Sequence, residues 1–131
     1  MGDSHISDNI PENRKDDFLM VQFKKIAEIG KIRKKEKCDG GIIHVGDLFN
    51  YWKTSYATTG KLIKCLIEND MYINGVLGSH DLQGYNLETK DDSAIGLLEK
   101  AGVFLEYRGE GLLEDGKIYA RYIHAKLRHD L

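Results

Sequence analysis

Apolar residues recur every three or four positions in three stretches of the chain, and this spacing predicts three amphipathic helices. The stretches span residues 16–37, 56–69 and 91–100. Two aspartates open the first stretch and a run of lysines and arginines closes it, which suits the dipole of a helix. In the third stretch, Asp91 or Asp92 is expected to cap the first turn, and Gly102 to end the helix.

Short apolar runs rich in β-branched residues predict strands between and after these helices. Residues 42–45 form such a run between glycines, which is typical of a strand buried on both faces of a parallel sheet. Further strands are expected at residues 71–77, 103–107, 112–114 and 117–123, and Asp115-Gly116 predicts a hairpin turn. Because helices alternate with strands up to Gly102, we expect an α/β fold with a mainly parallel sheet.

Composition narrows the class of protein. The 131 residues carry 19 Lys and Arg against 21 Asp and Glu, and 41% are hydrophobic, which excludes a disordered tail and suits one domain over residues 1–131. Cys38 and Cys65 lack the spacing of a disulfide framework and favour a reducing cytoplasm. No apolar run approaches the ~20 residues of a membrane span, and no signal peptide opens the chain. We expect an intracellular protein without a membrane partner.

Three short polar segments stand where the chain starts or leaves a predicted strand. In residues 2–5 (Gly-Asp-Ser-His), the Asp and His fall on the same side of an extended chain and could chelate a metal. In Gly46-Asp47, a carboxylate follows a buried strand, where it is paired, bound to metal or used as a cap. In residues 78–81 (Gly-Ser-His-Asp), an imidazole beside a carboxylate suits a general acid. A solvated terminus and a plain turn are the alternatives for the first and last segments.

The order and spacing of these segments resemble the calcineurin-like metallophosphoesterases, whose leading motifs are D-x-H, G-D and G-N-H-D or G-N-H-E. Residues 84–103 are most similar to the phage and bacterial DNA-repair exonuclease branch, and the resemblance covers residues 2 to about 105. It implies a sandwich with a β-sheet core flanked by helices. It also implies two divalent metal ions, manganese foremost with iron or zinc as alternatives, and hydrolysis of phosphodiester bonds, with DNA as the substrate.

The resemblance also assigns roles to residues. Asp3 and His5 would hold one metal ion, and Asp47 would bridge both. His80 would protonate the leaving group or steady the phosphoryl oxygens, and Asp81 would orient His80. By contrast, His44 lies inside a predicted strand, and we interpret it as a core residue rather than a ligand.

The sequence departs from the family pattern in three ways. Only Met1 and Gly2 precede Asp3, where the family has a central strand. Ser79 replaces the motif's Asn, so it would be a shorter and poorer ligand to the second metal. No G-H-x-H motif occurs, and His124 could stand in for a missing ligand or occupy a surface or core position. We therefore expect a domain truncated at its first strand and in its C-terminal half.

Two further features bear on function. Residues 24–37 hold seven Lys or Arg against two Glu, a local charge of +5 that suits either a nucleic acid or a solvated helix face. Tyr51, Trp52 and Tyr56 could stack on bases or pack under a helix. The alternative function is a non-catalytic binding or structural module with a protein partner or a second copy. A receiver-like domain is the weakest option, because it gives residues 78–81 no role.

Overall fold

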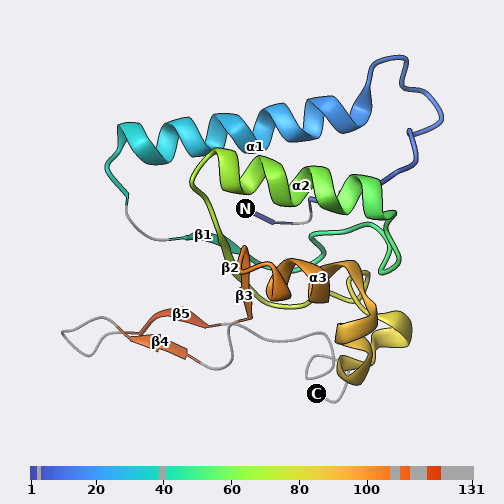
Figure 1. Ribbon diagram of the computed structural model, residues 1–131. Helices are drawn as coiled ribbons and strands as arrows, with labels where there is room; N and C mark the ends of the chain where they lie inside the picture. The colour runs from blue at the N-terminus through green and yellow to red at the C-terminus, as the bar shows by residue number, and fades with distance from the viewer. Residues whose placement is uncertain (3, 39–40, 107–109, 113–117, 122–131) are drawn as a thin grey trace.

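The computed structural model describes residues 1–2, 4–38, 41–106, 110–112 and 118–121 (Figure 1). Its helices are α1 (Phe18–Lys35), α2 (Tyr56–Glu68) and α3 (Ala94–Lys100), with short 3-10 helices η1 (Gln83–Tyr85) and η2 (Leu87–Asp92). Its strands are β1 (Ile42–His44), β2 (Ile73–Gly75), β3 (Phe104–Glu106), β4 (Glu110–Leu112) and β5 (Ile118–Arg121). Every expected helix is present, and β1, β2, β3 and β5 lie within expected strands but are shorter than the sequence predicted. β4 shares only Leu112 with the strand expected at residues 112–114, whose other two residues lie outside the described residues. Three expectations, the Asp115-Gly116 turn, Asp3 and His124, lie outside the described residues.

The main sheet is parallel, with the strand order β1-β2-β3. Its register aligns Ile42 with Ile73 and Ile73 with Phe104, and α2 and α3 connect the successive strands. β4 and β5 form a separate antiparallel pair. The predicted α/β class with a parallel sheet is therefore confirmed.

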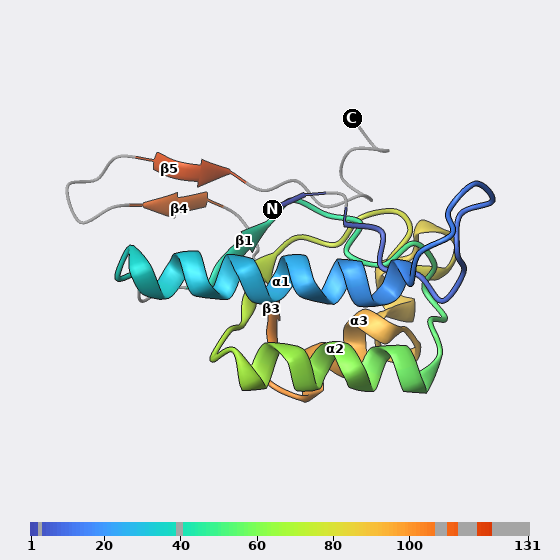
Figure 2. The same cartoon turned by 90° about the horizontal axis from the view of Figure 1, so that it is seen from above.

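One face of the sheet carries the core. Ile42, Ile73 and Phe104 are buried in a cluster with residues of all three long helices, and α1 and α2 lie side by side above it (Figures 1 and 2). Side chains alternate between the two faces of a strand, so Ile43 and Leu105 point the other way, and they are 44% and 51% exposed. Our expectation that β1 is buried on both faces was wrong, because the described residues cover only one face.

The N-terminal segment is hydrogen-bonded along β1 and the turn that follows it. The nitrogen of Met1 donates to the carbonyl of Ile43 at 2.8 Å, and the N–H of Val45 donates to the carbonyl of Met1 at 3.1 Å. Further along, Ile6 forms a parallel bridge with Phe49. These bonds satisfy backbone groups at the outer edge of β1 that would otherwise have no partner in the sheet.

The start of α3 differs from the prediction. Asp91 and Asp92 belong to η2, and Ser93 is the cap, since its backbone is extended and its side chain accepts the N–H of Gly96. The expected stop is confirmed: Gly102 follows the helix with φ +78°, a left-handed conformation that glycine adopts at little cost. No helix in the described ranges has both the length and the apolar character needed to cross a membrane.

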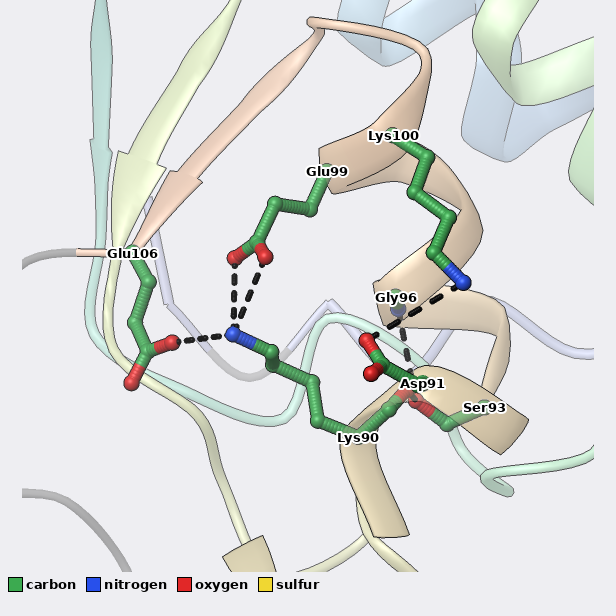
Figure 3. A network of polar contacts seen from close by, with 7 residues as sticks. All are labelled: Lys90, Asp91, Ser93, Gly96, Glu99, Lys100 and Glu106. Atoms are coloured by element: carbon green, nitrogen blue, oxygen red, sulfur yellow. Dashed lines mark hydrogen bonds and ion pairs between the residues drawn. The ribbon is translucent and has the colours of Figure 1, made fainter. Parts of the chain in front are cut away.

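A lysine between two carboxylates ties η2 to α3 and β3 (Figure 3). The Nζ of Lys90 lies 2.9 Å from Glu99 and 2.8 Å from Glu106, and the side chain of Glu106 is only 6% exposed. Burial disfavours the charge of Lys90, but the two carboxylates outweigh burial and raise its pKa above the ordinary value. The ammonium group therefore keeps two partly buried carboxylates close together.

Replacing this lysine should destabilise the fold. In Lys90→Met, the carboxylates of Glu99 and Glu106 face each other without the ammonium group, which should lower the free energy of unfolding by about 2–3 kcal/mol. Lys64→Met is the matched control, because Lys64 pairs with Glu68 on the exposed side of α2 at 3.7 Å and should change stability by less than about 0.5 kcal/mol. Urea denaturation of both variants makes the comparison, and equal losses would contradict it.

Candidate functional site

The turns that follow β1 and β2 meet at the carboxyl edge of the sheet. The Oδ1 atom of Asp47 accepts the backbone N–H of His80 at 2.8 Å. The turns are so close that a Cβ on Gly78 would lie 2.1 Å from both the backbone nitrogen and the Oδ1 of Asp47. Glycine is therefore required at position 78 for the two turns to touch.

His5 joins these two turns from the N-terminal segment. Its backbone N–H donates to the carbonyl of Asp47 at 3.1 Å, and its ring lies edge-on to that of His80, with 5.0 Å between centroids. The side-chain amide of Gln22, on α1, donates to the carbonyl of His5 at 3.3 Å. The Nδ1 atom of His5 is buried and has no hydrogen-bond partner among the described residues. A buried nitrogen of this kind needs a partner, and a metal ion would be one.

The backbone is strained at two of the expected ligands. His5 and Asp47 have φ values of +45° and +51°, in the left-handed region that residues other than glycine seldom adopt. Such strain persists only where the surrounding structure enforces it, and it is common at functional sites. The strain and the unpartnered nitrogen both point to this edge of the sheet as the functional site.

A backbone carbonyl, and not Asp81, holds the imidazole of His80. Its Nδ1 lies 3.0 Å from the carbonyl oxygen of Asn50. A carbonyl only accepts, so Nδ1 carries the proton and Nε2 is left for another partner. We expected Asp81 to orient this ring, but its carboxylate is committed to backbone N–H groups instead. Nothing in the sequence pointed to Asn50, because the contacting atom belongs to the backbone.

Asp81 connects the two turns from inside the protein. Its fully buried carboxylate accepts the N–H of Phe49 at 2.9 Å, of Gly78 at 2.9 Å and of Leu48 at 3.4 Å. Burial raises the pKa of Asp81 from 3.8 to about 6; the bonds from Phe49 and Gly78 partly offset this, and the nearby charge of Asp47 adds to it. Asp81 thus fixes the geometry of the site without facing a ligand.

His44 is fully buried, as expected for a core residue, but it also contacts the N-terminal segment. The N–H of Gly46 donates to its Nδ1 at 3.1 Å, so the proton of the neutral ring is on Nε2. From there the ring donates to the hydroxyl of Ser4 at 3.0 Å. His44 therefore helps to place the segment that carries His5, a role that the sequence analysis missed.

The structure brings together most of the expected site residues. His5, Asp47 and His80 meet at one edge, and half-buried Ser79 lies in the same turn as His80. Asp3 and His124 lie outside the described residues. Among the residues that are described, no three His, Cys, Asp or Glu side chains form a group able to hold a metal ion. A complete ligand set would need Asp3 or a residue beyond the described ranges.

Comparisons with known proteins do not assign the sequence to a family. No protein-family model matches the sequence, and a comparison with curated proteins finds no match.

The close approach at Gly78 can be tested with an alanine. In Gly78→Ala, the new Cβ must push the turn of Asp47 away, and we expect a loss of at least about 2 kcal/mol in the free energy of unfolding. The matched control is Gly60→Ala in α2, where a Cβ meets nothing within 4 Å. That change should stabilise the helix by about 0.5–1 kcal/mol. A tolerated Gly78→Ala would contradict the observed contact between the two turns.

The raised pKa of Asp81 predicts a pH dependence of stability. The folded chain holds this proton more tightly than the unfolded chain, so Asp81 should make the free energy of unfolding fall between pH 3.8 and about 6. The total decrease in the free energy of unfolding should be about 2–3 kcal/mol. Above about pH 6, Asp81 should cause no further decrease. Asp81→Asn cannot titrate, so its deficit relative to the unmodified chain should shrink as pH rises through this window. Urea denaturation in EDTA at several pH values measures it, and a constant deficit would contradict the assignment.

Proposed function

We propose that this protein is a metal-dependent phosphoesterase that hydrolyses phosphodiester bonds, with DNA as its substrate. The observation that carries the proposal is the meeting of His5, Asp47 and His80 at the carboxyl edge of a parallel sheet, where ligands bind in open α/β folds. The Nδ1 of His5, buried and without a hydrogen-bond partner in the part of the chain that the structure describes, fits a metal ligand. The resemblance of residues 2–5, 46–47 and 78–81 to metallophosphoesterase motifs supports the same conclusion.

His5 and Asp47 would hold the metal, together with Asp3. The Oδ2 atom of Asp47 makes no hydrogen bond within the described residues, so it remains available while Oδ1 is held by His80. Carboxylate and imidazole ligands suit manganese, iron or zinc. Two such ions, when bound, polarise a phosphate ester and activate water for in-line attack. Ser79 offers only a hydroxyl where the second ion would need an amide oxygen.

His80 would protonate the leaving group or contact the phosphoryl oxygens. Its Nδ1–H donates to the carbonyl of Asn50, so Nε2 is the ring nitrogen left for a ligand. When protonated, Nε2 can donate its proton to the leaving oxygen, and otherwise it contacts the phosphoryl oxygens. The fixed carbonyl of Asn50 sets the orientation of the ring before substrate binds.

A polyanionic substrate is supported by the surface of α1 and the residues that follow it. Six exposed lysines along this surface make no ion pair with any described residue: Lys24, Lys25, Lys31, Lys34, Lys35 and Lys37. Clustered lysines of this kind attract a phosphate backbone irrespective of its sequence. Gln22, two residues before the first of these lysines, contacts the segment of His5, so the basic surface begins near the candidate site and runs along α1 away from it.

A non-catalytic module is the second candidate. It is favoured by the same hydrogen bond that fixes the site, because His80 already occupies one oxygen of Asp47. It is also favoured by the absence of a three-ligand group among the described residues. On this interpretation, the protein would bind a partner or a single ion without turnover.

Manganese binding and hydrolysis separate the two candidates. We expect calorimetry to show two Mn²⁺ sites, and the protein to cleave a phosphodiester such as bis(p-nitrophenyl) phosphate but not the corresponding monoester. Asp47→Asn should abolish both sites and lower the rate by at least about 100-fold. Asp16→Asn, which changes an exposed acid paired with Arg14, is the control and should leave both unchanged. One weak site or none, without hydrolysis, would support the non-catalytic module.

A further inference from the structure

A cavity of about 450 Å³ lies beside the loop that leaves the candidate metal site. Residues 53–56 line one side of it, and residues 91–94, Leu97 and Lys100 line the other. The loop contacts both the candidate site and the cavity lining. The carbonyl of Asn50 contacts the ring of His80 in the site, and the carbonyl of Trp52 accepts the N–H of Ala94 in the cavity lining at 2.9 Å. Asn50 contacts His80 of the candidate site, and Ser55 lines the cavity. Because these two residues can be at most about 17 Å apart, one strand of nucleic acid can reach both the candidate site and the cavity.

The cavity presents an aromatic ring to solvent. Tyr56, in the first turn of α2, lines it and is 90% exposed. Leu97, 39% exposed, and Ala94 add an apolar surface from α3. Water solvates such surfaces poorly, whereas a flat aromatic ligand can stack on the ring and cover them.

The charges of the cavity favour a neutral ligand over a phosphate. Lys53 and Lys100 are balanced by Asp91 and Asp92, and Lys100 lies 4.0 Å from Asp91 (Figure 3). Two carboxylates at this position oppose the binding of an anion. The lining therefore differs from the surface of α1 and the residues after it, where residues 24–37 carry a local charge of +5 that suits phosphates.

The polar groups of the cavity mainly accept hydrogen bonds. The hydroxyls of Ser55, Thr59 and Ser93 already donate, to Asp8, to the carbonyl of Ser55 and to the carbonyl of Lys90. The hydroxyls of Ser55 and Ser93 also accept the N–H of Thr58 and of Gly96, so what each hydroxyl can still offer a ligand is a lone pair and not a proton. Together with the carboxylates of Asp91 and Asp92, they suit a ligand with several N–H or O–H groups around an aromatic ring. A nucleoside has this chemistry.

We propose that this cavity binds a nucleoside of the DNA strand whose phosphodiester lies at the candidate metal site. The base stacks on Tyr56, and its amino groups donate to Asp91 and Asp92. This assignment rests on the proposed function for the position of the strand. The loop from Asn50 to Ser55 would set the spacing between the cleaved bond and the bound base.

Binding without metal tests the cavity separately from catalysis. Trp52 is the only tryptophan of the sequence; it precedes Lys53 of the cavity lining, and its carbonyl accepts the N–H of Ala94, also in the lining, so we expect its fluorescence to report binding there. In EDTA, a tetradeoxyadenylate should quench Trp52 and bind about tenfold more tightly than an abasic strand with the same number of phosphates. Tyr56→Ala should lose this preference, and Tyr56→Phe should keep it. Met20→Ala, a change at an exposed apolar side chain of α1, is the control and should have no effect.

Three results would overturn the inference. They are equal or absent binding of the two strands, an unchanged preference in Tyr56→Ala, and displacement of the oligonucleotide by millimolar inorganic phosphate alone, which would show an anion site. Failure of the proposed function gives a different pattern. Base-dependent quenching with no manganese-dependent hydrolysis would support the nucleoside site and contradict the proposed hydrolysis. Hydrolysis without base-dependent quenching would support the enzyme and contradict the nucleoside site.

Discussion

The geometry of the candidate site depends on one buried carboxylate. Asp81 accepts backbone N–H groups from the turn after β1 and from the turn after β2, and so it holds two segments that are about thirty residues apart in sequence. Three N–H groups that would otherwise be buried without a partner are satisfied by one side chain. Burial makes the charged form unfavourable, and the raised pKa reflects that penalty. The three satisfied N–H groups offset part of this penalty.

This link gives the neighbouring residues their positions. With the turns held together and glycine at position 78, the carboxylate of Asp47 reaches the backbone of His80. The N-terminal segment then hydrogen-bonds to the same turn and adds His5. Strained backbone at His5 and Asp47 is the local consequence, since both residues must turn sharply to reach one point. The candidate site is therefore formed by the turns after β1 and β2 and by the N-terminal segment, at the carboxyl edge of a small parallel sheet.

Much of the fold could be predicted, and the misses have physical causes. Apolar periodicity located α1 and α2 to within two residues at each end, because it reflects which side of a helix is buried. It could not show that Ser93 caps α3, since three polar residues in a row can each cap a helix. It also could not show that β1 is covered on one side only. An apolar run looks the same whether or not a second layer covers it.

The sequence by itself determined the elements and the chemical groups of the site, because helix periodicity, turn glycines and the Asp and His motifs are local properties of the chain. The roles of those groups were decided by tertiary structure. Asp81 binds backbone and not His80, the carbonyl of Asn50 orients that ring, and buried His44 reaches Ser4. Each of these contacts joins residues about thirty or more positions apart, and two of them use backbone atoms that every residue possesses. Only the folded chain selects which distant atoms meet.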